Sequence, residues 1–211
     1  SLGAAMLASK KTLTNKMLPK KNYNFYLGSR FSEMQIEKAL KFRKANYQRP
    51  KNYHLYVAQR LLEGKIVGWF HGGAEFGPRA LGNRSIIGDA RSLKTKERIN
   101  SVVKGRPNFQ PFCPSILEED REKLFEQSYK NKHMTCAFKM KKEFAKILPS
   151  AVHIDDTARP QFVEENDNGN YYKILKEIKK ITGYGVVVNT SFNKHGRTMV
   201  MKPEDALSDF L

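Results

Sequence analysis

The chain has 211 residues, 40% of them hydrophobic and 28% charged, so it is long and apolar enough to fold around a core of its own. No stretch approaches the roughly 18 consecutive apolar residues of a membrane span, and the first residues lack the charge and length of a signal peptide, so we expect a cytoplasmic protein. Lys and Arg number 38 against 21 Asp and Glu, and a net charge of +17 favours anionic ligands: nucleic acid, membrane phosphates or small phosphorylated substrates.

The first half of the chain predicts mainly helices. Residues 1–8 indicate the end of a helix of small residues, followed by a Lys-rich connector to about residue 26. Ser32 and Gln35 have the spacing of a capping box, which predicts a helix to about residue 45. A second helix is predicted over 53–62, with a Gly directly beyond its end.

From residue 66 onward, predicted strands alternate with predicted helices. The apolar runs 66–70 and 185–188 are typical of buried strands, and alternation over 135–140 indicates a third. Helices are predicted over 94–103, over 119–129, between the Asn168–Gly169 turn and Gly183, and from Pro203 onward. This alternation favours an α/β layered domain.

The first segment with chemistry follows the strand at 66–70. Gly and Pro residues shape a loop over 72–82, from which Arg79 and Arg84 emerge, with Ser85 beside them. A guanidinium offers a planar fork of donors that matches phosphate or carboxylate oxygens, so this loop is a candidate anion site. The alternative is that both arginines pair with structural carboxylates such as Glu75 or Asp89.

The second segment covers residues 104–115. Its three prolines stiffen the backbone, so Lys104 and Arg106 are presented from a loop with little freedom to lose. Phe109 and Phe112 could flank a flat ligand such as a nucleobase. Alternatively, the segment is a rigid connector held by two core phenylalanines, which explains the two cations less well.

Two later segments supply further polar groups. Residues 153–161 bring an imidazole, two carboxylates, Thr157 and Arg159 together, and the strand at 185–188 runs into Asn189, Ser191 and Asn193. Ligands of α/β sheets meet the chain at the carboxyl ends of strands, although turn capping also explains such Asn and Ser residues. The sequence contains no GxSxG elbow, GxGxxG, Walker loop or HExxH, and its two Cys have no ligand spacing, so we predict no nucleophile and no metal site within this chain.

Together, the four segments EFGPRALGNRSI, KGRPNFQPFCPS, HIDDTARPQFV and VVNTSFNKHG resemble, in order, those of the NodU/CmcH family of O-carbamoyltransferases. The resemblance covers about residues 55–211. It implies that 21–211 is the C-terminal YrdC-like domain, a twisted mixed α/β sheet flanked by helices. Residues 1–20 would be the tail and connector of an N-terminal actin-like ATPase-fold domain that contains the iron.

The resemblance also implies an activity: an ATP-dependent carbamoyltransferase that forms carbamoyl-adenylate from carbamoyl phosphate and ATP, with Mg²⁺, for transfer to a hydroxyl of a small-molecule or glycan acceptor. Lys104 and Arg106 would be catalytic together with Arg79. The binding contacts would come from Arg84, Ser85, Thr157, Arg159, Asn189, Ser191 and Asn193. The chain departs from the family at Gly73 and Gln110, where Arg is common, and at Arg197–Thr198, where an acidic residue and Pro are usual.

Two other hypotheses about the function remain open. A YrdC-like module could bind RNA or another nucleic acid, although no aromatic–basic RNA-binding motif is present and the cations cluster in Gly/Pro loops. The chain could also be a stand-alone threonylcarbamoyl-adenylate synthase. We expect carbamoyl phosphate, ATP and the N-terminal domain as partners, rather than a membrane or nucleic acid; a homodimer and the identity of the acceptor are left open.

Overall fold

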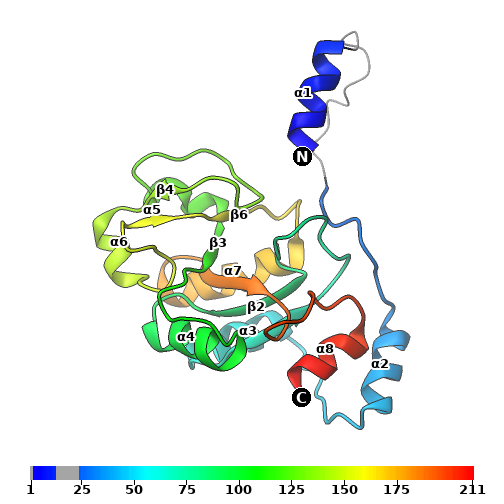
Figure 1. Cartoon of the computed structure of the whole chain (residues 1–211). Helices are drawn as coiled ribbons and strands as arrows, with labels where there is room; N and C mark the ends of the chain where they lie inside the picture. The colour runs from blue at the N-terminus through cyan, green and yellow to red at the C-terminus, as the bar shows by residue number, and fades with distance from the viewer. Residues whose placement is uncertain (1, 13–23) are drawn as a thin grey trace.

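The computed structural model describes residues 2–12 and 24–211 (Figure 1). The expected N-terminal helix is present as α1, Leu2–Thr12. Most of the Lys-rich connector lies outside the described residues, and the division of the chain at residue 20 stays a prediction. None of the described helices is long and apolar enough to cross a membrane.

The capping-box prediction is confirmed at helix α2, Glu33–Phe42. The Gln35 N–H donates to Ser32 Oγ at 3.3 Å, and the Ser32 N–H donates to Gln35 Oε1 at 2.8 Å. The helix ends before the predicted residue 45, because Lys44 takes a left-handed conformation with φ of 50°. Helix α3, Tyr53–Leu62, has the predicted bounds.

A five-stranded mixed sheet forms the centre of the domain. Its strands, in spatial order, are β1 Val67–Phe70, β2 Arg84–Asp89, β7 Val186–Ser191, β3 Cys113–Leu117 and β6 Gln161–Val163. Only β3 and β6 are parallel. The strands predicted near 66–70 and 185–188 are both present, but β1 is an edge strand in which only Trp69 is buried, so its predicted full burial is wrong.

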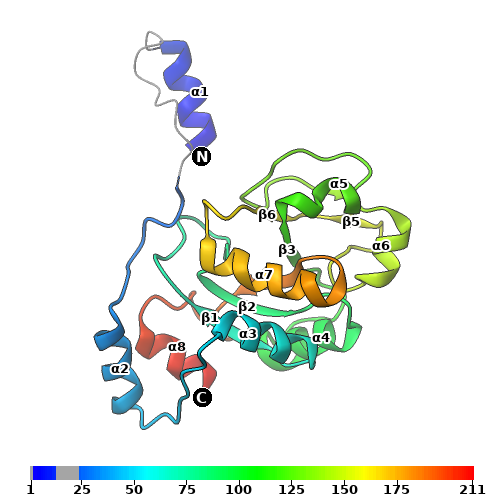
Figure 2. The same cartoon turned by 180° about the vertical axis from the view of Figure 1, so that it is seen from behind.

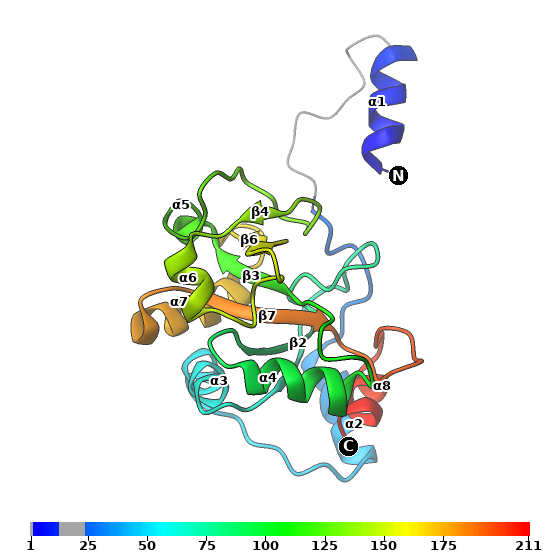
Figure 3. The same cartoon turned by 60° about the vertical axis from the view of Figure 1, so that its left-hand side comes forward.

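Alternating side chains give the sheet two apolar faces. On β7, Val187 packs toward α3 and α7, Gly169–Thr182, whereas Val186 and Val188 pack on the opposite face. Figure 2 shows α3 and α7 beside each other in front of the strands. The opposite face is covered by α4, Leu93–Arg98, and α6, Lys142–Ile147, and Figure 3 shows α4 on that side.

Several shorter elements complete the domain. They are the π-helical turn η1 Ile99–Val103, the 3₁₀ turn η2 Glu118–Asp120, α5 Arg121–Leu124, the two-residue strands β4 Phe138–Lys139 and β5 Thr157–Ala158, which pair with each other, and α8 Pro203–Phe210, which packs against α2. The predicted helix over 119–129 is too long, because Phe125 is extended and pairs with Met140. The predicted strand over 135–140 shortens to β4.

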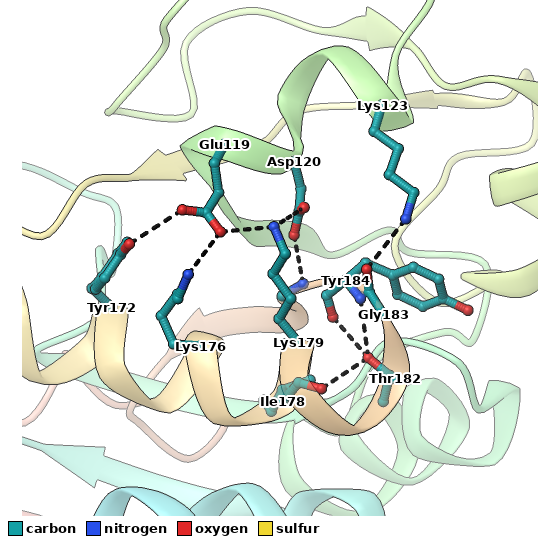
Figure 4. A network of polar contacts seen from close by, with 11 residues as sticks. Glu119, Asp120, Lys123, Tyr172, Lys176, Ile178, Lys179, Thr182, Gly183 and Tyr184 are labelled. Atoms are coloured by element: carbon teal, nitrogen blue, oxygen red, sulfur yellow. Dashed lines mark hydrogen bonds and ion pairs between the residues drawn. The ribbon is translucent and has the colours of Figure 1, made fainter.

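A polar network fastens α7 to the end of β3 (Figure 4). Lys179 lies between Glu119 Oε1, at 2.7 Å, and Asp120 Oδ1, at 2.6 Å. The second oxygen of the buried Asp120 accepts the Gly185 N–H at 2.7 Å, just before β7 begins. One pair of carboxylates in η2 therefore ties this turn to α7 and to the residue just before β7, both distant from η2 in the sequence.

Candidate anion-binding site

A cavity of about 250 Å³ opens where β7 ends and β3 begins. All four segments singled out in the sequence contribute to its wall. Its lining residues are Pro78, Arg79, Ala80, Arg106, Gln110, Pro111, Phe112, Cys113, Met134, Arg159, Asn189, Thr190 and Ser191. Three guanidinium groups and no carboxylate line this hollow, which makes it suited to an anion.

Each of the three arginines comes from a different loop. Arg79 follows Pro78 in the Gly/Pro-rich loop and is exposed; no hydrogen bond or ion pair of the described chain uses its side chain. Arg159 follows β5, and its Nε and Nη2 donate to Cys113 Sγ at 3.3 and 3.1 Å. The thiol at the start of β3 thus fixes one edge of this guanidinium.

Arg106 is held on two sides. Its Nε donates to Asn100 Oδ1 at 2.6 Å, and its guanidinium carbon lies 4.6 Å from the centre of the Phe112 ring. The cation–π contact and the hydrogen bond orient the plane of the group. Burial lowers the pKa of Arg106, but a guanidinium stays charged at neutral pH.

Lys104 is buried at the margin of the cavity, next to Ser191. Its Nζ donates to Ser191 O at 2.6 Å and to Asn193 Oδ1 at 2.8 Å, and it also reaches Ser191 Oγ and Asn193 O. Burial and the charge of Arg106 lower the pKa of Lys104 to about 8, while Asp209 opposes the shift. Lys104 does not line the cavity itself, but it orders the strand end that does.

Asn189 has an unsatisfied buried acceptor in the cavity wall. Its Nδ2 donates to Ala80 O and Ser115 Oγ, both at 3.0 Å. Since a backbone carbonyl can only accept, these contacts fix which end of the amide is nitrogen. The remaining Oδ1 is buried without a hydrogen-bond partner, a costly arrangement that an N–H donor would relieve.

Five of the predicted site residues do not line the cavity: besides Lys104 and its partner Asn193, they are Arg84, Ser85 and Thr157. Arg84 is fully buried, and its guanidinium donates to the carbonyls of Ser29, His71, Gly72 and Asn83 at 2.8–3.3 Å. Ser85 is fully buried on β2 and accepts the Gly82 N–H. Thr157 donates to Asp155 Oδ1 at 2.7 Å and does not line the hollow. Arg84 and Ser85 are thus occupied by contacts within the fold, and their ligand contacts stay a prediction.

The carboxylates suggested as partners of the arginines also serve other groups. Glu75 Oε1 accepts the backbone N–H of Leu81, Asn83 and Arg84 at 2.7–3.1 Å, which fixes the loop that carries Arg79. Asp89 pairs with Arg91 at 2.8 Å. Neither carboxylate neutralises the side chain of Arg79.

A second, mainly apolar hollow of about 610 Å³ adjoins the basic one. Pro111 lines both. The second hollow is otherwise lined by Lys96, Phe109, Pro149, Val152, His153, Ile154 and Asp155. The side chain of Phe109 is 82% exposed, so it is not the core anchor considered as an alternative, whereas Phe112 is buried.

Three residues of this site were not predicted from the sequence. Met134 lines the cavity with a positive φ of 55°, a strained conformation for a non-Gly residue, and nothing in the sequence marked it. Cys113 was noted only as an isolated thiol. Asn100, which holds Arg106, lies inside a predicted helix and carried no signal beyond its polarity.

The comparisons with known proteins show the family of this chain. The sequence model described as Carbamoyltransferase C-terminus matches residues 58–211. The chain is 57% identical to an uncharacterized protein of Methanocaldococcus jannaschii, MJ1058, over 88% of this chain and 31% of that protein. It is 32% identical to the 3'-hydroxymethylcephem-O-carbamoyltransferase of Streptomyces clavuligerus, over 72% of this chain and 29% of that enzyme.

The mixed α/β fold and the sequence model that matches most of the chain place it with the C-terminal part of carbamoyltransferases. The chain belongs to the Carbamoyltransferase C-terminus family. It spans about a third of the length of the curated relatives described above.

A solved structure supports the fold. Full-length HypF, crystallised in the phosphate- and nucleotide-bound form, aligns with 79% of this chain and 20% of its own, with a TM-score of 0.52 and 17% identity. At that identity the likeness shows the fold alone. The expectation of a YrdC-like mixed sheet is therefore confirmed.

Proposed function

We propose that this chain forms carbamoyl-adenylate from carbamoyl phosphate and ATP, for transfer of the carbamoyl group to a hydroxyl acceptor. One observation carries the proposal: Arg79, Arg106 and Arg159 line a single hollow that contains no carboxylate. Carbamoyl phosphate and ATP are both polyanions, and three guanidinium groups in one cavity would compensate their mutual repulsion.

The reaction needs positioning and charge compensation rather than a protein nucleophile. Water first adds to the carbonyl carbon of carbamoyl phosphate, the C–O bond to the phosphate breaks, and carbamate and inorganic phosphate form. An oxygen of this carbamate then attacks the α-phosphorus of ATP. A new O–P bond forms, the bond between the α-phosphorus and the bridging oxygen breaks, and pyrophosphate leaves. Fixed cations stabilise the charge that builds on the leaving phosphates. Arg106 and Arg79 would contact that charge, and Lys104 would hold Ser191 and Asn193 in place beside it.

The apolar hollow next to the cavity supports ATP as the second substrate. A nucleotide combines a flat, largely apolar base with a polyanionic tail, and the two hollows meet at Pro111. We place the base against Phe109 and Ile154, which are both highly exposed without a ligand. Stacking on an aromatic ring stabilises a base by about 1–3 kcal/mol.

The lining of the cavity does not fit a magnesium ion held by the protein. Hard divalent cations prefer carboxylate oxygens, and no carboxylate lines this hollow. Among residues 2–12 and 24–211, moreover, no group of three His, Cys, Asp or Glu side chains gathers as a metal site would. The proposal therefore assigns no step to a magnesium ion bound by side chains of this chain.

The test is exchange of labelled pyrophosphate into ATP that depends on carbamoyl phosphate. We expect Arg106→Ala and Lys104→Ala to lower the exchange rate at least about a hundredfold, as loss of one preorganised charge contact does in comparable sites. Phe109→Ala should raise the ATP concentration needed for half-maximal exchange.

Two further variants make the test specific. Lys94→Ala changes an exposed lysine of α4 outside both hollows and should leave exchange unchanged. Exchange at near-normal rates in both Arg106→Ala and Lys104→Ala would refute the proposed site. Exchange that proceeds without carbamoyl phosphate would refute the proposed substrate.

A further inference from the structure

The side chain of Asn100 forms several hydrogen bonds to the loop 104–110, which carries Lys104 and Arg106. It lies in the π-helical turn η1, just before Lys104, and its side chain is fully buried. Helical residues with this polarity usually point to solvent or cap a turn. Single π-helical turns are frequent at functional sites, because the extra residue redirects the side chains around it.

The Asn100 carboxamide uses both of its ends on the loop that follows. Its Nδ2 donates to Asn108 O at 3.3 Å and to Gln110 O at 3.1 Å. Its Oδ1 accepts from Arg106 Nε at 2.6 Å, and its backbone carbonyl accepts the Arg106 N–H at 3.0 Å. The Asn100 side chain therefore holds the loop 104–110 in place and fixes the Arg106 guanidinium through Nε.

These contacts leave the two terminal nitrogens of Arg106 available to a ligand. No hydrogen bond or ion pair found in the described chain uses Nη1 or Nη2 of Arg106, which lines the cavity. With Nε and the Phe112 ring fixing the plane, these two nitrogens form a preset pair of donors. Such a pair matches two oxygens of a phosphate group.

The amide is also the right chemistry for this position. A carboxylate there would accept the same hydrogen bond, but it would neutralise the charge that an anionic ligand needs. An amide oxygen orients the guanidinium and leaves its full positive charge facing the cavity.

We infer that Asn100 is a positioning residue, which sets the orientation of Arg106 toward the phosphate of the substrate without cancelling its charge. This inference rests on the proposed function for the identity of the ligand. Asn100 itself does not line the cavity and touches no reacting atom.

A double-mutant cycle tests the inference, with inorganic phosphate as the probe and the dissociation constant measured by titration calorimetry. Asn100→Asp and Asn100→Ala should each weaken phosphate binding about tenfold in the natural background. In the Arg106→Ala background, Asn100→Ala should weaken it less than about twofold, because its effect passes through Arg106. Equal losses in both backgrounds would overturn the inference.

A measurement without any ligand separates the inference from the proposed function. The Arg106 Nε–H should give a slowly exchanging NMR signal, assigned by its absence in Arg106→Lys and lost in Asn100→Ala. Ser101→Ala, which alters an exposed neighbour in the same turn, should keep it. If the chain binds no phosphate, the proposed function fails, and the inference is then decided by this signal alone. Survival of the signal in Asn100→Ala would overturn the inference.

Discussion

At the scale of single residues, two arginines five positions apart have opposite roles. Arg79 is exposed at the cavity, whereas Arg84 is buried among carbonyls and lies 3.7 Å from the centre of the Phe70 ring. Gly82 stands between them with φ of +97°, and a β-carbon there would collide with the Tyr171 ring. A turn that requires glycine therefore lies between the exposed and the buried arginine.

This difference predicts opposite phenotypes for the same substitution. Arg84→Met removes a donor from four backbone carbonyls, of which those of His71 and Gly72 have no other hydrogen bond among the described residues, and should destabilise the fold by roughly 3 kcal/mol or more. Arg79→Met should change stability by less than about 0.5 kcal/mol, as is usual for exposed positions, while weakening phosphate binding. Urea unfolding and phosphate titration of both variants check the prediction. A destabilised Arg79→Met would contradict it.

Lys104 predicts a pH dependence of anion binding. With its pKa lowered to about 8 by burial and by Arg106, Lys104 is charged at pH 7 and loses its proton as the pH rises through 8. Sulfate, whose charge is constant over this range, should therefore bind more weakly at pH 9 than at pH 7. Lys104→Arg keeps the charge and should flatten this profile. An unchanged profile in Lys104→Arg would show that another group titrates.

At the scale of elements, the carboxylate–lysine network decides how α7 seats on the sheet. Glu119 accepts from Lys176 and Lys179, and these contacts lower the pKa of Glu119 to about 2 (Figure 4). Asp120 connects Lys179 to the Gly185 N–H. The exposed members of the network contribute little individually, but Asp120 is buried and links two elements.

The lowered pKa of Glu119 predicts the pH range in which the stabilisation from this network is lost. Its folded pKa is lower than the ordinary 4.5, so the stabilisation is present above pH 4.5 and disappears as the pH falls toward 2. Glu119→Gln should flatten the pH dependence of the unfolding free energy in that window. Glu177→Gln removes an exposed pair with Lys180 and should leave the dependence unchanged. Equal slopes in the Glu119→Gln variant and the unmodified protein would rule out this role.

At the scale of the whole molecule, the cavity exists only when all four loops are in place. A ligand that binds this assembled site and not the unfolded chain must raise the midpoint of thermal unfolding. At a phosphate concentration a hundred times the dissociation constant, the gain is about 2.7 kcal/mol. We expect this gain to shrink with added NaCl and to vanish in a variant lacking Arg79, Arg106 and Arg159. An equal gain in that triple variant would place the anion elsewhere.

Local patterns were sufficient for elements whose signals lie close together in the sequence. The capping box at Ser32 fixed the start of α2, and Asn168 and Gly183 bound α7 at both ends. Strand β7 was visible as a run of valines. By contrast, β2, β3 and β6 went unrecognised, because polar residues such as Arg84 and Gln161 interrupt their apolar pattern and are buried only through distant partners.

The sequence by itself determined the family, the α/β class and the loops that carry the cations, because ordered motifs and hydrophobic periods are local properties. Only the tertiary structure decided which of those cations meet. Arg79, Arg106 and Arg159 line one cavity, whereas the guanidinium of Arg84 donates its hydrogen bonds to carbonyls from three separate segments. The physical reason is that a buried guanidinium donates to the carbonyls that the fold brings near, and those of Ser29, His71 and Gly72 belong to other parts of the chain.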